Sequence, residues 1–264
     1  MTRDVDKPIP TDAGLWTRLR GLTVARIGLA RSGASLATGP LLDFRLAHAR
    51  ARDAVHAELD IATLSNDLTT LDLPVLTLAS AAADKQTYLM RPDFGRQLAP
   101  DAEKSLAAHA GVYDVVFVIS DGLSAQAIQA HAAPLMTRAV AALKAEGWRI
   151  APIVIVSRGR VAIGDRVAAL LRAQCVAMLI GERPGLSAPD SMGAYVTWQP
   201  RPQTSDAERN CISNIRPGGI AYSDAAVKLV HLMQAMRTRG LSGVGLKDET
   251  DRVPIAGGSD TSQV

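Results

Sequence analysis

Four polar segments hold the residues of this sequence best suited to bind a ligand. They read SDGLS (120–124), SRGRV (157–161), GERPGL (181–186) and ERNCISN (208–214). Glycine frees the backbone to approach a ligand, carboxylates and backbone carbonyls accept hydrogen bonds, and arginine donates them. Such segments suit a ligand that is rich in amide and phosphate groups.

Cys211 is the side chain in these segments closest in kind to a catalytic nucleophile, and the neighbouring Arg209 is expected to lower its pKa. A nucleophile also needs a base beside it. No histidine follows a predicted strand, because all five lie in predicted helices: His48, His56, His109, His131 and His231. Asp121 and Glu182 would meet at the same rim, but nothing local makes one an acid and the other a base. We therefore expect Cys211 to be a binding or structural thiol, and this chain to supply no catalytic residue.

The sequence also lacks the common metal and nucleotide motifs. Only two cysteines are present, without Cys-x-x-Cys or Cys/His ligand spacing, so we expect no metal site. Gly28 and Gly33 have the spacing of a phosphate loop, but Ala34 and Ser35 stand where Lys and Ser or Thr are needed. No Gly-x-Gly-x-x-Gly motif follows a strand. A cobalamin, with its ring of amide side chains, and a nucleotide both remain compatible with the four segments, because composition does not separate them.

The elements that position these segments alternate between strands and helices after Gly111. Aliphatic runs predict strands at 115–122, 149–160, 175–185 and 192–200, and helical patterns follow at 123–147, 163–174 and 223–240. This alternation indicates an α/β fold with a Rossmann-like, mostly parallel sheet that has helices on both faces. Ligands bind beyond the carboxyl ends of such strands, so the four segments are expected to converge on one edge.

A smaller, mainly helical region precedes this domain. A helix is predicted over 39–60 from apolar residues at helical spacing, among them Leu41, Leu42, Phe44 and Leu46. The segment TYLMRPDFGRQL (87–98) is interpreted as an extended piece, followed by a helix from Asp93 toward Ala110. The chain is thereby divided into a flexible tail, a helical region, an α/β domain that carries the four polar segments, and a second flexible tail: 1–13, 14–110, 111–250 and 251–264.

The bulk composition bounds the class of protein. Of the 264 residues 47% are apolar, which allows a sizeable core, and the net charge of +3 is too mild to indicate a nucleic-acid partner. No apolar run reaches the ~20 residues of a membrane span, and the first twenty residues lack the apolar run of a signal peptide. We expect a cytoplasmic globular protein.

Longer segments of the chain are similar to one known family, the small (light) subunit of ethanolamine ammonia-lyase. The resemblance rests on TVARIGLARSGA, TYLMRPDFGRQL, VVFVISDGLSAQAI, GRVAIGD, VAMLIGERPGLSAPDSMGAYV and AERNCISNIRPGG. It covers most of residues 22–249, and motifs such as LIGERPGL and NCISNI are too long and idiosyncratic for a chance match.

The resemblance implies a subunit of an adenosylcobalamin-dependent lyase that converts ethanolamine to acetaldehyde and ammonia. It implies a TIM-barrel large subunit that binds the substrate and hosts the radical chemistry, and a hexamer of such heterodimers. The cobalamin contacts of the family match Val161 in GRVAI, Glu182 in IGERPG and Cys211 in RNCISN. The Asp-x-His-x-x-Gly signature of base-off cobalamin domains is missing, so we expect no protein ligand to cobalt.

Two other functions compete with this one. A stand-alone nucleotide-binding α/β enzyme requires a phosphate fingerprint or a base–nucleophile pair, and the sequence has neither. A purely structural partner subunit, without ligand contacts, is harder to separate from a cofactor-binding one. Many family members carry a longer N-terminal extension that is linked to packaging in a bacterial microcompartment, and the short tail of this chain leaves such packaging open.

Overall fold

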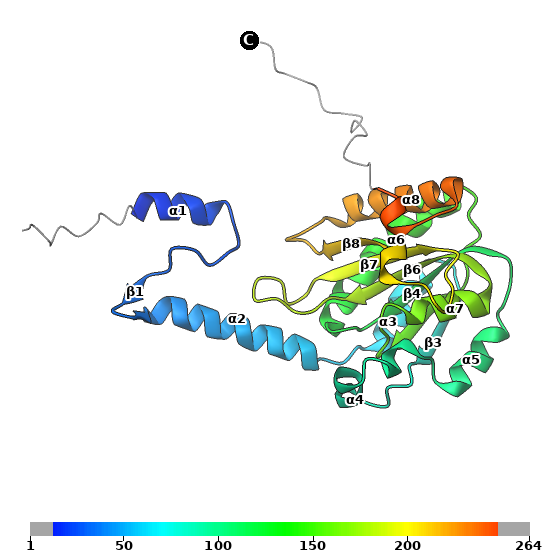
Figure 1. The fold of residues 1–264 in the computed structure, drawn as a ribbon, viewed down its shortest axis with the longest axis horizontal. Helices are drawn as coiled ribbons and strands as arrows, with labels where there is room; N and C mark the ends of the chain where they lie inside the picture. Colours follow the sequence, from blue (N-terminus) through cyan, green and yellow to red (C-terminus); the bar gives the residue numbers. More distant parts are fainter. Residues whose placement is uncertain (1–12, 248–264) are drawn as a thin grey trace, which may run out of the picture.

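A six-stranded sheet forms the centre of the molecule (Figure 1). The computed structural model describes residues 13–247. Its sheet has the order β3-β5-β4-β6-β7-β8, built from β3 (Val75–Ala79), β4 (Tyr113–Ser120), β5 (Ile153–Ser157), β6 (Ala173–Gly181), β7 (Met192–Trp198) and β8 (Asn210–Ile215). The first four run parallel, whereas β7 is antiparallel to both of its neighbours. The expected α/β fold with a mostly parallel sheet is confirmed, and the sheet is mixed at its β7–β8 edge.

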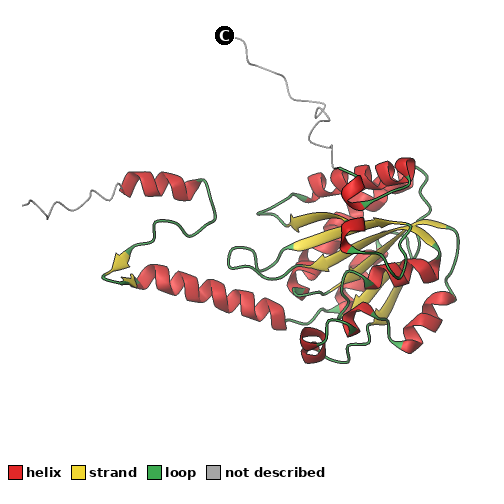
Figure 2. Ribbon diagram, in the orientation of Figure 1, coloured by secondary structure: helices red, strands yellow, loops and turns green. Residues whose placement is uncertain are grey.

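Helices cover both faces of this sheet (Figure 2). One face carries α3 (Ile61–Thr69), α6 (Ala125–Ala145) and α8 (Tyr222–Arg239), and the other carries α5 (Pro100–Ala107) and α7 (Ile163–Leu171). Successive residues of β6 alternate between the two cores, so Leu179 belongs to the core that includes α6 and α8, while Met178 belongs to the core that includes α7. Both cores are mainly aliphatic, as the 4% content of aromatic residues requires.

An N-terminal arm extends from the sheet domain (Figure 1). It consists of α1 (Ala13–Gly21), a short hairpin of β1 (Arg31–Ser32) and β2 (Ser35–Leu36), and α2 (Thr38–His56). The helix predicted over 39–60 is therefore confirmed, although it ends at His56. Three large apolar side chains of α2 are exposed: Leu42 by 56%, Phe44 by 38% and Leu46 by 51%. The arm thus presents an apolar surface that the rest of the described chain leaves uncovered.

The region before Gly111 contains a strand that the sequence analysis missed. Val75–Ala79 forms β3, which pairs in parallel with β5 at the edge of the sheet. This strand has five residues and is only partly buried, so it lacks the long aliphatic run that marks β4 and β6.

The interpretation of 87–98 as an extended piece was wrong. Lys85–Met90 forms helix α4, because the Asp84 carboxylate accepts a hydrogen bond from the Thr87 amide at 2.7 Å and caps the first turn. The helix expected from Asp93 is divided into a single 3₁₀ turn, η1 (Phe94–Arg96), and α5, which begins with a proline at its first position.

The ends of the chain fall outside this description. The predicted tails at 1–13 and 251–264 lie beyond the described residues, except for Ala13, which opens α1. Within 13–247, no helix combines the length and the apolar character that crossing a membrane requires.

Candidate functional site

One part of the sheet lacks a covering helix. Helix α7 packs on β4 and β6, and on the same side of the sheet Tyr195 of β7 is partly exposed, while Cys211 and Ser213 of β8 are exposed. We call these three residues the open face. On the opposite side of the same strands, Ala194 and Ile212 are buried beneath α8. The open face is therefore a surface that the fold itself does not use for its core.

The segment ERNCISN is not the loop that the sequence analysis expected. Asn210–Ile215 forms the edge strand β8, paired antiparallel with β7 through Tyr195 and Cys211. Because β7 reverses direction, β8 starts at the far edge of the sheet, and only its end returns to the edge that carries the other three segments. Cys211 thus lies within the sheet, level with Tyr195, which in turn pairs with Met178 of β6. The polar residues beside Cys211 in β8 are tolerated because this outermost strand is largely exposed.

Glu182 follows β6 and ties it to the end of β8. Its Oε2 atom accepts a hydrogen bond from the backbone N–H of Asn214 at 3.1 Å, where a bulge shifts the β7–β8 register. Asn214 has a φ of 59° there, a left-handed conformation that asparagine tolerates well. A methyl group at Gly193 would lie 3.0 Å from Oε1, so the glycine makes room for the carboxylate. Oε1 has no hydrogen bond or ion pair with any described residue, and it remains free for a ligand.

Cys211 is exposed, but its thiol is not activated. Desolvation by the surrounding protein raises the pKa of the thiol; the Tyr195 hydroxyl lowers it and the Glu182 carboxylate raises it further. The expected lowering of this pKa by Arg209 was wrong, because the Arg209 guanidinium is paired with Asp165 instead. The thiol is therefore protonated at neutral pH, consistent with a binding or structural role.

Val161 lies beside the open face. It is half-buried, two residues before the first residue of α7, and it lines a cavity of about 390 Å³ that Tyr195 also lines. The same tyrosine interacts with Cys211 and with the charge of Glu182, both of which raise its pKa after the larger effect of desolvation. The structure thus brings the three predicted cofactor contacts together around one tyrosine.

Asp121, the other carboxylate considered at the rim, belongs to a separate group. It is buried, lies 3.6 Å from the Lys85 ammonium, and accepts a hydrogen bond from the backbone N–H of Arg158 at 2.6 Å. These contacts hold the start of the β5–α7 loop, where Arg158 has a φ of 57°. Asp121 and Glu182 therefore have different partners and do not form an acid–base pair.

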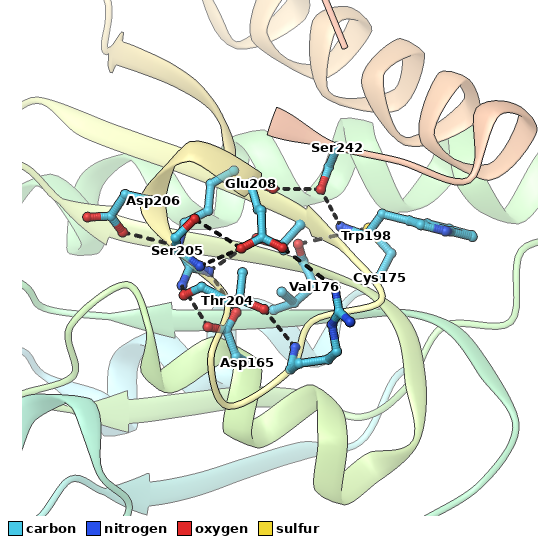
Figure 3. A network of polar contacts seen from close by, with 12 residues as sticks. Asp165, Cys175, Val176, Trp198, Thr204, Ser205, Asp206, Glu208 and Ser242 are labelled. Carbon is cyan, nitrogen blue, oxygen red and sulfur yellow. Dashed lines mark hydrogen bonds and ion pairs between the residues drawn. The ribbon is translucent and has the colours of Figure 1, made fainter. Parts of the chain in front are cut away.

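A buried ion pair fixes the entry to β8 (Figure 3). The Nη1 and Nη2 atoms of Arg209 donate to the two carboxylate oxygens of Asp165 in α7, each at 2.7 Å. Both side chains are at most 4% exposed. The Thr204 carbonyl accepts a further hydrogen bond from Arg209 at 3.0 Å, just before the 3₁₀ turn η2 (Asp206–Glu208). This anchor joins β8 to α7 two residues before Cys211.

A larger cavity, of about 620 Å³, lies at the opposite edge of the sheet. Its lining includes Arg172 at the end of α7 and Trp198 at the end of β7, and it contains none of the predicted site residues. Between residues 13 and 247, no group of three or more His, Cys, Asp or Glu side chains is arranged to hold a metal ion.

Sequence reasoning missed Tyr195 and Asn214. In MGAYVTWQP the alternation of a strand places Tyr195 on the face opposite Ala194 and Val196, and a tyrosine on that opposite face was a usable signal. Asn214 had no local signal, because its partner Glu182 is 32 positions away in the sequence.

Comparison with known proteins agrees with the resemblance seen in the sequence. Residues 13–247 match the family model described as "Ethanolamine ammonia-lyase light chain (EutC)". The chain is 50% identical over 252 residues to the ethanolamine ammonia-lyase small subunit of Azotobacter vinelandii. The matched residues make up 94% of this chain and 93% of that protein.

Two further relatives bear the same name. The small subunit of Xanthomonas campestris pv. campestris is 50% identical over 258 residues, and that of Pseudomonas aeruginosa is 49% identical over 259 residues; in each case 96% of this chain and 94% of the relative are covered. The words "small subunit" imply a large-subunit partner. The family model matches every described residue, and these relatives match over nearly their whole length. The chain therefore belongs to the ethanolamine ammonia-lyase small-subunit family and is a subunit of a carbon–nitrogen lyase.

Proposed function

We propose that the open face and the cavity beside it bind adenosylcobalamin at the junction with the large subunit. The observation that carries the proposal is the grouping of Val161, Glu182 and Cys211 around Tyr195, on a part of the sheet that no helix covers. A corrin is a broad macrocycle rimmed by neutral amide side chains. It requires an open surface with apolar contacts and a few well-placed acceptors, which is the composition found here.

Each of the three residues has a separate task in this proposal. Val161 supplies apolar contact for the edge of the macrocycle. Glu182 is held through Oε2 by Asn214, and it offers Oε1 to an amide N–H or a hydroxyl of the ligand. The Cys211 thiol packs against the ligand without reacting, because its raised pKa keeps it protonated.

The division of chemistry follows from these roles. Bound adenosylcobalamin supplies the organic radical through homolysis of its cobalt–carbon bond. The residues of this chain orient the corrin and exclude water from its edge, while substrate binding belongs to the large subunit. We expect no cobalt ligand from this chain.

The large subunit, a TIM barrel in this family, is proposed to cover the open face and the apolar surface of the arm. Leu42, Phe44 and Leu46 of α2 are all at least 38% exposed. An apolar surface of this kind promotes self-association when its partner is missing. The resulting heterodimers are proposed to assemble into a hexamer of pairs.

Co-expression with the large subunit tests the proposal. The complex should form acetaldehyde from ethanolamine only when adenosylcobalamin is added, whereas the isolated chain should be inert and should self-associate. Cyanocobalamin, an unreactive analogue, should bind the complex and bind less tightly when Val161, Glu182 or Cys211 is replaced. If the complex is active but its affinity for cobalamin is unchanged by all three replacements, this chain is a structural partner without ligand contacts.

A further inference from the structure

The cavity beside Val161 carries an excess of positive charge. Its charged lining residues are Arg96, Arg160, Arg209 and Asp206, next to the half-buried Val161 and Tyr195. We call it the arginine cavity. Since Val161 and Tyr195 also border the open face, a ligand lying on that face can extend one of its groups into the arginine cavity.

Arg209 forms a wall of this cavity and is not available to a ligand. Two of its nitrogens are used by Asp165, and Nε lies 3.3 Å from the Asp206 carboxylate (Figure 3). Its charge is therefore balanced within the protein.

Arg160 is held in place and retains unused donors. Its guanidinium stacks over the Tyr88 ring at 4.2 Å, and Nη2 donates to the Tyr88 carbonyl at 2.9 Å. The stack requires Gly95, where a methyl group would lie 2.7 Å from the Arg160 side chain. Neither Nε nor Nη1 has a hydrogen-bond partner within residues 13–247. Nε is buried, whereas Nη1 is not. The Nη1 donors thus remain available to a ligand on a side chain that is already ordered.

Arg96 adds a second available cation. It is exposed, and its guanidinium has no hydrogen bond or ion pair among the described residues. With Arg209 included, the guanidinium groups exceed the carboxylates of Asp165 and Asp206 by one positive charge. This balance fits a ligand group that carries a single negative charge.

The chemistry of the proposed cofactor contains one such group. The amide side chains of a corrin are neutral, whereas the nucleotide loop of a cobalamin carries a phosphodiester with one negative charge. Arginine matches phosphate oxygens in both charge and geometry. We propose that the arginine cavity receives this phosphodiester and that Arg160 and Arg96 hold it. The inference rests on the proposed function, because it requires the corrin to lie on the open face.

Binding of three probes to the complex of small and large subunits tests the proposal without turnover. Cyanocobalamin carries the phosphodiester, cobinamide phosphate carries a phosphate without the base, and dicyanocobinamide carries neither. Arg160→Gln should weaken the first two about tenfold or more, since a charged hydrogen bond is lost, and should leave dicyanocobinamide binding unchanged. Arg96→Gln should act in the same direction, by a smaller factor. Arg172→Gln removes an exposed charge from the larger cavity at the opposite edge and should change none of the three affinities.

Inorganic phosphate provides a further arm. At matched ionic strength it should compete with cyanocobalamin for the wild-type complex more than chloride does, and this difference should vanish in Arg160→Gln. Phosphate that binds without displacing cyanocobalamin would assign the cavity to a free anion and overturn the proposal.

The results distinguish a failure of the proposed function from a failure of the phosphodiester site. A wild-type complex that binds no cobalamin overturns the proposed function. A complex that binds cobalamin, but in which Arg160→Gln weakens all three probes equally, makes Arg160 a support for Tyr88 and overturns the phosphodiester site alone. If Arg160→Gln fails to assemble, Arg96→Gln decides, because an unchanged preference for cyanocobalamin over dicyanocobinamide contradicts the proposal.

Discussion

The Oε2 atom of Glu182 lies 3.1 Å from the backbone nitrogen of Asn214, so a carboxylate proposed to contact the cofactor also closes the end of an edge strand. One oxygen holds the protein, and the other has no partner among the described residues. A change at position 182 therefore acts on the ligand and on β8 through different atoms.

Glu182→Gln should weaken the binding of cyanocobalamin to the complex by about ten- to a hundredfold. The amide oxygen can still accept from Asn214, but the ligand then meets an N–H₂ group in place of a charged acceptor, which contributes roughly 1.5–3 kcal/mol per bond. Turnover at saturating adenosylcobalamin should change much less, because the contact exists before and after homolysis. Spectrophotometric titration measures the affinity.

Two companion variants define the result. Gly193→Ala brings a methyl group within 3.0 Å of Oε1 and should weaken binding in the same direction, whereas Arg183→Gln, at the exposed neighbour, should have no effect. Equal affinities of the wild type and Glu182→Gln would mean that the carboxylate serves β8 only.

Alkylation of Cys211 by iodoacetamide at neutral pH should be slower than that of free cysteine, although the residue is exposed. Its raised pKa lowers the thiolate fraction, and the thiolate is the reacting species. Cyanocobalamin bound to the complex should slow the reaction further. Mass spectrometry of the labelled peptide measures both rates, with the buried Cys175 as an internal unreactive control. A rate above that of free cysteine contradicts the assignment of a neutral thiol.

Asp165→Asn should destabilise the sheet domain by about 3–5 kcal/mol, because it leaves the Arg209 guanidinium buried without its main counter-charge. Urea unfolding, followed by fluorescence and by circular dichroism, measures the loss. The double variant Asp165→Leu with Arg209→Met removes both charges and should recover most of the stability. A double variant as unstable as the single one would show that the pair does more than neutralise its own charges.

Acid should weaken the amino-end anchor of β4. The Arg149 guanidinium lowers the pKa of Asp114, an effect that burial opposes. The contribution to stability is therefore present above about pH 5 and is lost as the pH falls through the folded pKa, below the unperturbed value of about 3.9. Since the Arg149 side chain is 55% exposed, we expect only about 1 kcal/mol.

Asp114→Asn should remove this part of the pH dependence. Trp148 stacks with Arg237, which lies 4.0 Å from Asp114, so its fluorescence is a convenient probe. Identical slopes of unfolding free energy against pH between pH 5 and 3, in wild type and variant, would contradict the assignment.

The parts of the fold that the sequence predicts are those with local periodicity. The runs VVFVIS and CVAMLI give β4 and β6 because both faces of these strands are buried, so nearly every position of the runs is apolar. A continuous apolar run does not mark β3 or β8, because each lies at an edge of the sheet, where a strand can be short and partly polar.

The candidate site also contains residues that the local sequence predicts and residues that it does not. Glu182 could be placed from the strand before it, whereas the mid-sheet position of Cys211 depends on the reversal of β7, which no local pattern encodes. The Arg209–Asp165 pair joins residues 44 positions apart, and only the folded chain shows that Arg209 is turned away from the thiol.

The strand order of the sheet has a consequence for synthesis on the ribosome. Among the strands within residues 13–247, β3 pairs with β5 alone, yet the whole of β4 and α6 is translated between them. At ~5–20 residues per second, β5 is made roughly 4–15 seconds after β3. The arm, with its apolar helix α2, precedes all six strands of the sheet in the chain and therefore leaves the ribosome before them. A nascent chain that meets its large subunit early would therefore do so through the arm, before the sheet that carries the proposed cofactor site exists.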